Sequence, residues 1–180
     1  PDAEAAKAAE DYLDQKIAEC DSAGGVVECV ISGLPVGLGE PVFEKLDANL
    51  AKAILSIGAV KGFEIGDGFA ATKACGSENN DEFRMDGDKI VKETNHAGGV
   101  LGGISDGSDV VFRAAFKPTP SIAKSQETVT KDGANIDLVI HGRHDPVVVP
   151  RAVVVVESMA AITAMDMLLV SMTSRLDLIQ

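Results

Sequence analysis

A long apolar segment, residues 153–170, constrains the fold of this chain more than any other feature. It is nearly long enough to span a bilayer, but Glu157 and Asp166 interrupt it, and each carboxylate would destabilise a membrane span. Apolar side chains fill most of both flanks of the helical wheel, which is typical of a helix packed on more than one side. We therefore expect a buried helix of a soluble protein over about residues 150–176, in a layer with sheet beside it.

The composition sets the broad class of the protein. The chain has 180 residues, of which 46% are hydrophobic, enough for one ordinary domain with an aliphatic core. Its 28 acidic and 16 basic residues give a net charge of −12, which argues against nucleic-acid binding but allows a small anionic ligand. The 3 cysteines have no CxxC spacing, so we expect reduced thiols in a cytoplasmic protein, with no zinc site and no membrane span.

The remaining segments predict an α+β fold in β-α-β sandwich-type layers, with long buried helices packed against an antiparallel sheet. We expect helices over residues 3–20 and 41–57, and strands over 26–31, 109–116 and 135–141. Residues 59–75 indicate a pair of strands joined at Gly66-Asp67-Gly68, whereas residues 76–109 and 117–133 indicate loops. The sequence shows no internal repeat and no linker, so residues 1–180 are expected to form a single unit.

Two loops carry the residues that suggest chemistry. Arg143, His144 and Asp145 place a cation, an imidazole and a carboxylate together, and Pro146 favours an extended or turned backbone there. A solvated turn with a local ion pair is the alternative interpretation. Residues 117–121 follow a strand, and two prolines fix a backbone whose ammonium, hydroxyl and N–H groups suit an anion such as phosphate. A plain surface turn would use the same residues.

Other motifs are weaker indicators. The glycines within residues 98–103 permit close approach of the backbone to a ligand or to a neighbouring strand. Residues 66–71 imitate the G-x-G-x-x-A of dinucleotide-binding loops, but no helix of useful length follows, so a hairpin turn is favoured. His141 and His144 lack metal-ligand spacing with any cysteine or acidic pair, and no metal site is expected. The sequence contains neither a P-loop nor a G-x-S-x-G elbow.

Several ordered motifs resemble those of chorismate synthases over almost the whole chain. They are DSAGG at residues 21–25, GLPVGLGEP at 33–41, KLDA at 45–48, SIGAVKGFEIG at 56–66, GSENNDE at 76–82, NHAGGVLGGIS at 95–105, KPTPSI at 117–122 and the stretch 142–157. The resemblance covers only the family's C-terminal half. The other half, with two catalytic histidines and an Arg/Ser-rich stretch that meets flavin and substrate, would lie upstream. The resemblance thus implies an incomplete fragment, inactive alone, whether a recombinant piece, a proteolytic product or a natural half.

The resemblance implies a lyase that converts 5-enolpyruvylshikimate 3-phosphate to chorismate and phosphate by a 1,4-anti elimination, with reduced FMN as cofactor. It further implies a cytoplasmic flavoprotein of the shikimate pathway of aromatic amino acid biosynthesis, and a homotetramer when full length. NADPH belongs to this expected chemistry, although the sequence leaves open whether flavin reduction is intrinsic or supplied by another protein. The alternative is a non-catalytic ligand-binding or oligomerisation module that retains the fold.

The resemblance also assigns roles to individual positions. Asp145 resembles the carboxylate near flavin N5 that assists proton removal from the substrate, and Arg143 resembles the arginine that reaches both flavin and substrate. No catalytic role is assigned to His144. The other expected cofactor-binding residues are Gly58, Ala59, Gly102, Lys117, Pro118, Thr119, Pro120 and Ser121.

Overall fold

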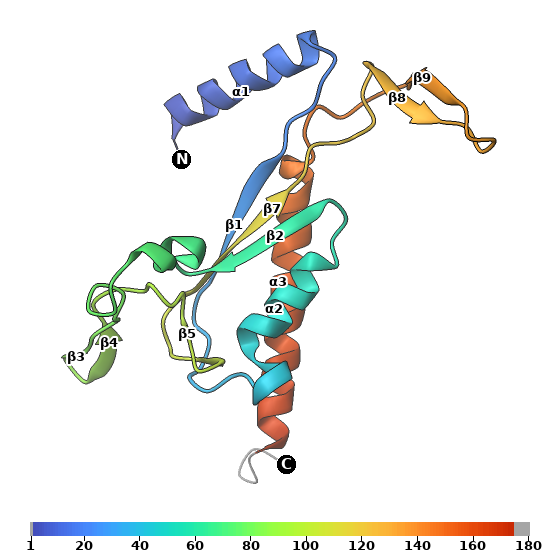
Figure 1. The fold of residues 1–180 in the computed structure, drawn as a ribbon. Helices are drawn as coiled ribbons and strands as arrows, with labels where there is room; N and C mark the ends of the chain where they lie inside the picture. Colours follow the sequence, from blue (N-terminus) through green and yellow to red (C-terminus); the bar gives the residue numbers. More distant parts are fainter. Residues whose placement is uncertain (1, 175–180) are drawn as a thin grey trace.

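In the computed structural model, which describes residues 2–174, an antiparallel sheet carries two helices on one face (Figure 1). The helices are α1 (Ala3–Ala18), α2 (Leu46–Leu55) and α3 (Val149–Thr173), with 3-10 turns η1 (Val42–Glu44) and η2 (Gly68–Lys73). The strands are β1 (Gly25–Ile31), β2 (Val60–Ile65), β3 (Phe83–Asp86), β4 (Lys89–Lys92), β5 (Val100–Leu101), β6 (Ile104–Ser105), β7 (Val110–Phe116), β8 (Ser125–Val129) and β9 (Asn135–Val139).

The main sheet has the strand order β1-β7-β2, with the central strand antiparallel to both neighbours. Alternate β7 side chains are buried on the helix-covered face, because successive residues of a strand point to opposite faces. The buried set is Val110, Phe112, Ala114 and Phe116. The opposite face is more open and carries an ion pair between Arg113 and Glu64, 3.1 Å apart. The strands predicted over residues 26–31 and 109–116 are confirmed to within one residue.

Helices α2 and α3 pack against each other and against β2 and β1, respectively. Helix α2 contributes Leu46, Leu50 and Ile54, each 0% exposed and spaced four residues apart on one side of the helix. The facing stripe of α3 is Ala152, Val156, Ala160, Thr163 and Met167. The predicted α+β fold, with helices packed against an antiparallel sheet, is confirmed.

Helix α3 differs from the expectation in how much of it is covered. Only one stripe is buried by the described residues, whereas Val154, Ile162 and Leu169 are 60%, 62% and 53% exposed. By length and composition alone, α3 is long and apolar enough to cross a membrane, a property that core helices of soluble proteins share. The last residues of the predicted helix, 175 and 176, lie outside the described range.

The predicted pair of strands over residues 59–75 is wrong in its second half. Strand β2 pairs with β7, and the chain then turns at Gly66, φ +54°, into the 3-10 turn η2. The backbone N–H of Phe69 in this turn donates to the Glu64 carboxylate at 3.1 Å. Residues 66–71 therefore form neither a hairpin nor a dinucleotide-binding loop, because β2 finds its partner far along the chain.

Three other predicted segments need correction. The helix predicted over residues 41–57 begins only at Leu46, whose N–H donates to the Gly103 carbonyl at 2.8 Å, a partner that local pattern cannot supply. The loop predicted over 117–133 contains β8, which pairs with β9 in a projecting hairpin (Figure 1). The loop predicted over 76–109 contains the small hairpins β3–β4 and β5–β6.

Candidate functional site

The Lys117–Ser121 loop leaves the end of the central strand β7. Its backbone is fixed at the start, where the N–H of Lys117 donates to the carbonyl of Ala59 at 2.9 Å. Gly58 and Ala59, which close the turn after α2, therefore lie beside the loop. Ala59 has φ +71°, a left-handed conformation that a residue with a Cβ seldom adopts. The structure thus brings three of the predicted cofactor-binding positions together at one end of the sheet.

The segment before β1 holds the middle of the same loop. The hydroxyl of Ser22 donates to the carbonyl of Thr119 at 2.7 Å. Just beyond the loop, the Lys124 ammonium lies 2.6 Å from the Asp21 carboxylate, and this hydrogen bond is the main reason that the pKa of Asp21 is lowered. These contacts join segments about 100 residues apart in sequence.

The Arg143–Asp145 loop meets the Lys117–Ser121 loop at the same end of the sheet. The N–H of Ala23 donates to the carbonyl of Pro146 at 2.8 Å, and Ala23 forms a parallel bridge with Val147. His144 joins the two loops directly, since its Nδ1 lies 3.3 Å from the hydroxyl of Ser121. The second loop is therefore anchored to both the segment before β1 and the first loop.

Charged side chains of both signs lie at this end of the sheet. Lys117 and Arg143 are exposed, and neither belongs to an ion pair among residues 2–174. Asp145 is half-buried, and its carboxylate accepts a hydrogen bond from Arg151 Nη1 at 3.0 Å. Lys117 and Arg143 are therefore two cations at this end of the sheet that remain available to an anion.

One buried polar atom also lacks a partner here. Within the part of the chain that the structure describes, the hydroxyl oxygen of Thr119 is buried and makes no hydrogen bond. A buried hydroxyl without a partner is unfavourable by about 1–3 kcal/mol, so such groups usually have a partner supplied by the protein or by something bound to it. Thr119 lies between Lys117 and Ser121, where an anionic ligand could supply that partner.

Gly102 is the one predicted cofactor-binding residue that the structure places elsewhere. It lies in the turn between β5 and β6 with φ +61°, and it is exposed. This turn is near the start of β7, whereas Lys117 follows its end. The 7 residues of β7, at about 3.3 Å per residue, separate the two positions by about 20 Å. Gly102 does not contact the two loops.

A buried charged cluster, not predicted from the sequence, organises the polar segment, residues 76–109. The Lys92 ammonium lies 2.7 Å from Asp106 and 3.2 Å from Asp81, with these side chains 2%, 6% and 3% exposed. Burial works to raise the pKa of Asp81, but hydrogen bonds from Ala97, Thr94, the His96 backbone and Lys92 outweigh it and hold the pKa far below its ordinary value. Burial also works to raise the pKa of Asp106, but hydrogen bonds from Lys92 and Ser108 outweigh this effect, and the pKa is lowered.

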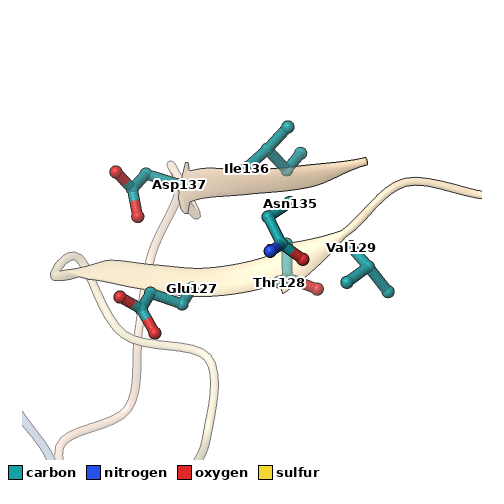
Figure 2. Close-up of a pocket in the computed structure, with 6 residues that line it drawn as sticks. All are labelled: Glu127, Thr128, Val129, Asn135, Ile136 and Asp137. Atoms are coloured by element: carbon teal, nitrogen blue, oxygen red, sulfur yellow. The ribbon is translucent and has the colours of Figure 1, made fainter. Parts of the chain in front are cut away.

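No other part of the described surface gathers the predicted residues. A shallow concavity of about 500 Å³ lies on the projecting hairpin of strands β8 and β9, and Figure 2 shows the side chains that line it. Its lining residues are Glu127, Thr128, Val129, Asn135, Ile136 and Asp137, none of which is a predicted site residue. Within residues 2–174, no group of three or more His, Cys, Asp and Glu side chains is placed to hold a metal ion.

The fold and the meeting of two cation-bearing loops define an α+β protein with a candidate anion site at one end of its sheet. The family model for chorismate synthase matches residues 1–169. The chain is 64% identical to chorismate synthase of Lachnoclostridium phytofermentans over 100% of this chain and 49% of that relative. It is 65% identical to chorismate synthase of Agathobacter rectalis over 98% of this chain and 48% of that relative.

A solved structure supports the same assignment. A crystal structure of chorismate synthase superposes with a TM-score of 0.75 at 33% identity, over 92% of this chain and 43% of that one. The chain therefore belongs to the chorismate synthase family. It spans about half the length of the curated relatives that it matches.

Proposed function

We propose that this chain contributes to a lyase that converts 5-enolpyruvylshikimate 3-phosphate to chorismate and phosphate by a 1,4-anti elimination with reduced FMN. Family membership supports the reaction class. The observation that carries the proposal is the His144–Ser121 contact, which holds the Arg143–Asp145 loop against the Lys117–Ser121 loop. Substrate, cofactor and leaving group are all anionic, and the exposed cations of these two loops suit them. We also propose that residues 1–180 form a single α+β unit.

The residues of the first loop fit a phosphorylated flavin. Lys117 offers a point charge, and the hydroxyls of Thr119 and Ser121 offer hydrogen bonds, one of them from a buried atom that has no other partner among the described residues. Pro118 and Pro120 restrict the backbone, so less conformational entropy is lost when a ligand binds. Gly58 and Ala59 provide backbone beside the loop. When bound, reduced FMN supplies an electron-rich ring next to the substrate.

The second loop provides the proposed acid–base group. The elimination removes a proton and a phosphate group from the substrate, and we assign assistance of the proton removal to the Asp145 carboxylate. The guanidinium of Arg151, 3.0 Å from that carboxylate, orients it. Arg143, on the other side of His144, is assigned to the anionic groups of flavin and substrate. We place Gly102 in the flavin site only if the complete protein brings the β5–β6 turn nearer to the loops.

Titration with oxidised and reduced FMN, with and without 5-enolpyruvylshikimate 3-phosphate, tests the binding site through flavin fluorescence and absorbance. Binding that tightens with substrate is expected. Lys117→Ala should weaken FMN binding about tenfold or more, because a charge-assisted hydrogen bond contributes about 1.5–3 kcal/mol. Lys131→Ala, in the exposed turn of the β8–β9 hairpin, is the matched control and should leave the affinity unchanged. Absence of binding at high micromolar FMN would contradict the assignment for this chain.

Asp145→Asn tests the catalytic assignment in protein that also carries the other half of the family's sequence. Turnover should fall about 10²–10⁴-fold while FMN affinity stays within about threefold, since general acid–base catalysis contributes about that factor. Asp132→Asn, on the exposed hairpin, should leave turnover unchanged. Equal turnover in the Asp145 variant and the parent protein would refute the role of this carboxylate.

We further propose that the complete enzyme is a cytoplasmic homotetramer and that NADPH is the source of electrons for the flavin. The exposed apolar flank of α3 supports assembly with other protein surface, because large apolar patches are seldom left open to water. Light scattering of the purified protein measures the mass of the assembly, and a monomeric mass would contradict this part of the proposal. Anaerobic reduction of bound FMN by NADPH, followed by absorbance, tests the electron source.

A further inference from the structure

His144 connects the two loops through both of its ring nitrogens. Its Nε2 lies 3.0 Å from the carbonyl oxygen of Ile140, and its Nδ1 lies 3.3 Å from the hydroxyl oxygen of Ser121. A carbonyl oxygen only accepts hydrogen bonds, so Nε2 must carry a proton whether the ring is neutral or charged. In the neutral ring, Nδ1 is then an acceptor, and the hydroxyl of Ser121 donates to it.

This arrangement determines what Ser121 can offer to a ligand. A serine hydroxyl has one proton. While that proton is directed at Nδ1, only the lone pairs of the hydroxyl remain, and these cannot donate a hydrogen bond to an anion. When Nδ1 is protonated, it becomes the donor and Ser121 the acceptor. The hydroxyl proton is then free to turn toward a phosphate group. The charged imidazolium adds an attraction of its own for the anion.

We infer that His144 is a positioning residue that decides whether Ser121 donates a hydrogen bond to an anionic ligand, so that binding at the Lys117–Ser121 loop is coupled to uptake of a proton by His144. The inference rests on the proposed function, which assigns an anion to this loop. The coupling is reciprocal: acid strengthens anion binding, and anion binding draws a proton onto the ring.

The charged groups around His144 are already partnered or lie beside it in the chain. His144 lines a hollow of about 200 Å³ together with Cys20 and Asp21. Asp21 is paired with Lys124, and this hydrogen bond keeps the pKa of the carboxyl low, so it stays ionised throughout the neutral range. Arg143 and Asp145 flank the ring in sequence. Imidazole is the side chain that can exchange a donor for an acceptor nitrogen by taking up one proton, and the two hydrogen bonds of His144 place that exchange at Ser121.

FMN affinity at pH 6 and pH 8, measured by flavin fluorescence, tests the coupling. The phosphate of FMN itself titrates near pH 6, so the informative quantity is the difference between the protein and its variants. His144→Gln keeps an amide that can donate to Ile140 but cannot titrate. The unmodified protein should lose about three- to tenfold more affinity between pH 6 and pH 8 than this variant. His141→Gln, at an exposed histidine of the same segment, should keep the full pH dependence.

Two further readouts separate this inference from a merely structural role of His144. Ser121→Ala leaves the histidine intact but removes the hydroxyl, and it should show the weaker pH dependence even where His144→Gln folds poorly. Calorimetry in two buffers of different ionisation enthalpy should detect proton uptake on binding. The same pH dependence in the protein and in both variants would overturn the inference and leave the proposed function standing. No FMN binding at either pH would overturn both.

Discussion

Replacement of Lys92 by methionine should be among the most destabilising single changes in the polar segment. The ammonium holds Asp106 at 2.7 Å, Asp81 at 3.2 Å and the amide oxygen of Asn95 at 3.1 Å, all in a nearly solvent-free cluster. Methionine preserves the volume of the lysine stem but leaves two buried carboxylates without a counter-charge. Breaking a buried ion pair by removing one partner costs about 3–5 kcal/mol.

The lower part of that range is the expected result. Asp81 keeps hydrogen bonds from the Thr94 hydroxyl and from the backbone N–H groups of His96 and Ala97, so its charge is still partly satisfied. A loss of about 3 kcal/mol is a large share of the roughly 5–15 kcal/mol by which domains are stable. It corresponds to a fall in Tm of about 6–12 °C for a chain of this size.

The pH dependence of the loss checks the cause. In the parent protein the folded-state pKa values of Asp81 and Asp106 are lowered, so their contribution to stability is present above the ordinary pKa of about 3.9 and is lost as the pH falls below it. Without the ammonium of Lys92, burial is opposed only by the remaining hydrogen bonds, so the protonated carboxyls become more favourable than in the parent protein. The variant should therefore gain stability relative to the parent as the pH is lowered from 7 to 4.

Urea unfolding at pH 7, 5.5 and 4, followed by circular dichroism, measures the free energies. Lys89→Met, an exposed lysine of the same hairpin, is the control and should change stability by less than about 0.5 kcal/mol. The double variant Lys92→Met/Asp106→Asn should recover part of the loss, since one buried charge is gone. A loss below about 1 kcal/mol, or one that is the same at every pH, would refute the electrostatic reasoning.

Two further predictions concern the core and the backbone. Ile54→Ala, at a side chain that is 0% exposed, should lower the free energy of unfolding by about 2–5 kcal/mol. Leu55→Ala, at a neighbouring side chain that is 50% exposed, should lower it far less. Similar losses for the two variants in urea unfolding would contradict the described packing. Gly39→Ala should destabilise by about 3 kcal/mol or more, because φ is +128° and a Cβ would meet the carbonyl of Gly103. Gly33→Ala, at φ +79° with open space around it, should show only the smaller backbone strain by the same assay.

The helices and strands that were predicted correctly are those whose local sequence pattern defines them without reference to distant residues. The run Val110–Phe116 is short and mostly apolar, and Leu46, Leu50 and Ile54 recur at helical spacing, so both elements follow from the local pattern. Strand β2 was predicted correctly, but its pairing was not, since apolar pattern does not tell a near partner from one about 50 residues further on.

The candidate site divides in the same way. Motif resemblance identified Lys117, Arg143 and Asp145, but their mutual placement depends on the bond from Ser22 to Thr119 and on the hydrogen bonds of His144. These contacts join residues 97 and 23 positions apart, and no periodicity signals them. The cluster around Lys92 was missed for the same reason, since lysine and aspartate are expected at the surface unless the fold is known to bury them.

The strand order β1-β7-β2 has a consequence for synthesis on the ribosome. Both outer strands are translated before the central one, and 44 residues separate Ile65, the last of β2, from Val110, the first of β7. At roughly 5–20 residues per second, the nascent chain waits for several seconds with two apolar strands whose proper neighbour does not yet exist. Direct pairing of β1 with β2 is the wrong structure most accessible in that interval. A chaperone that shields these strands should therefore raise the yield of folded protein more than slow cooling or dilution does.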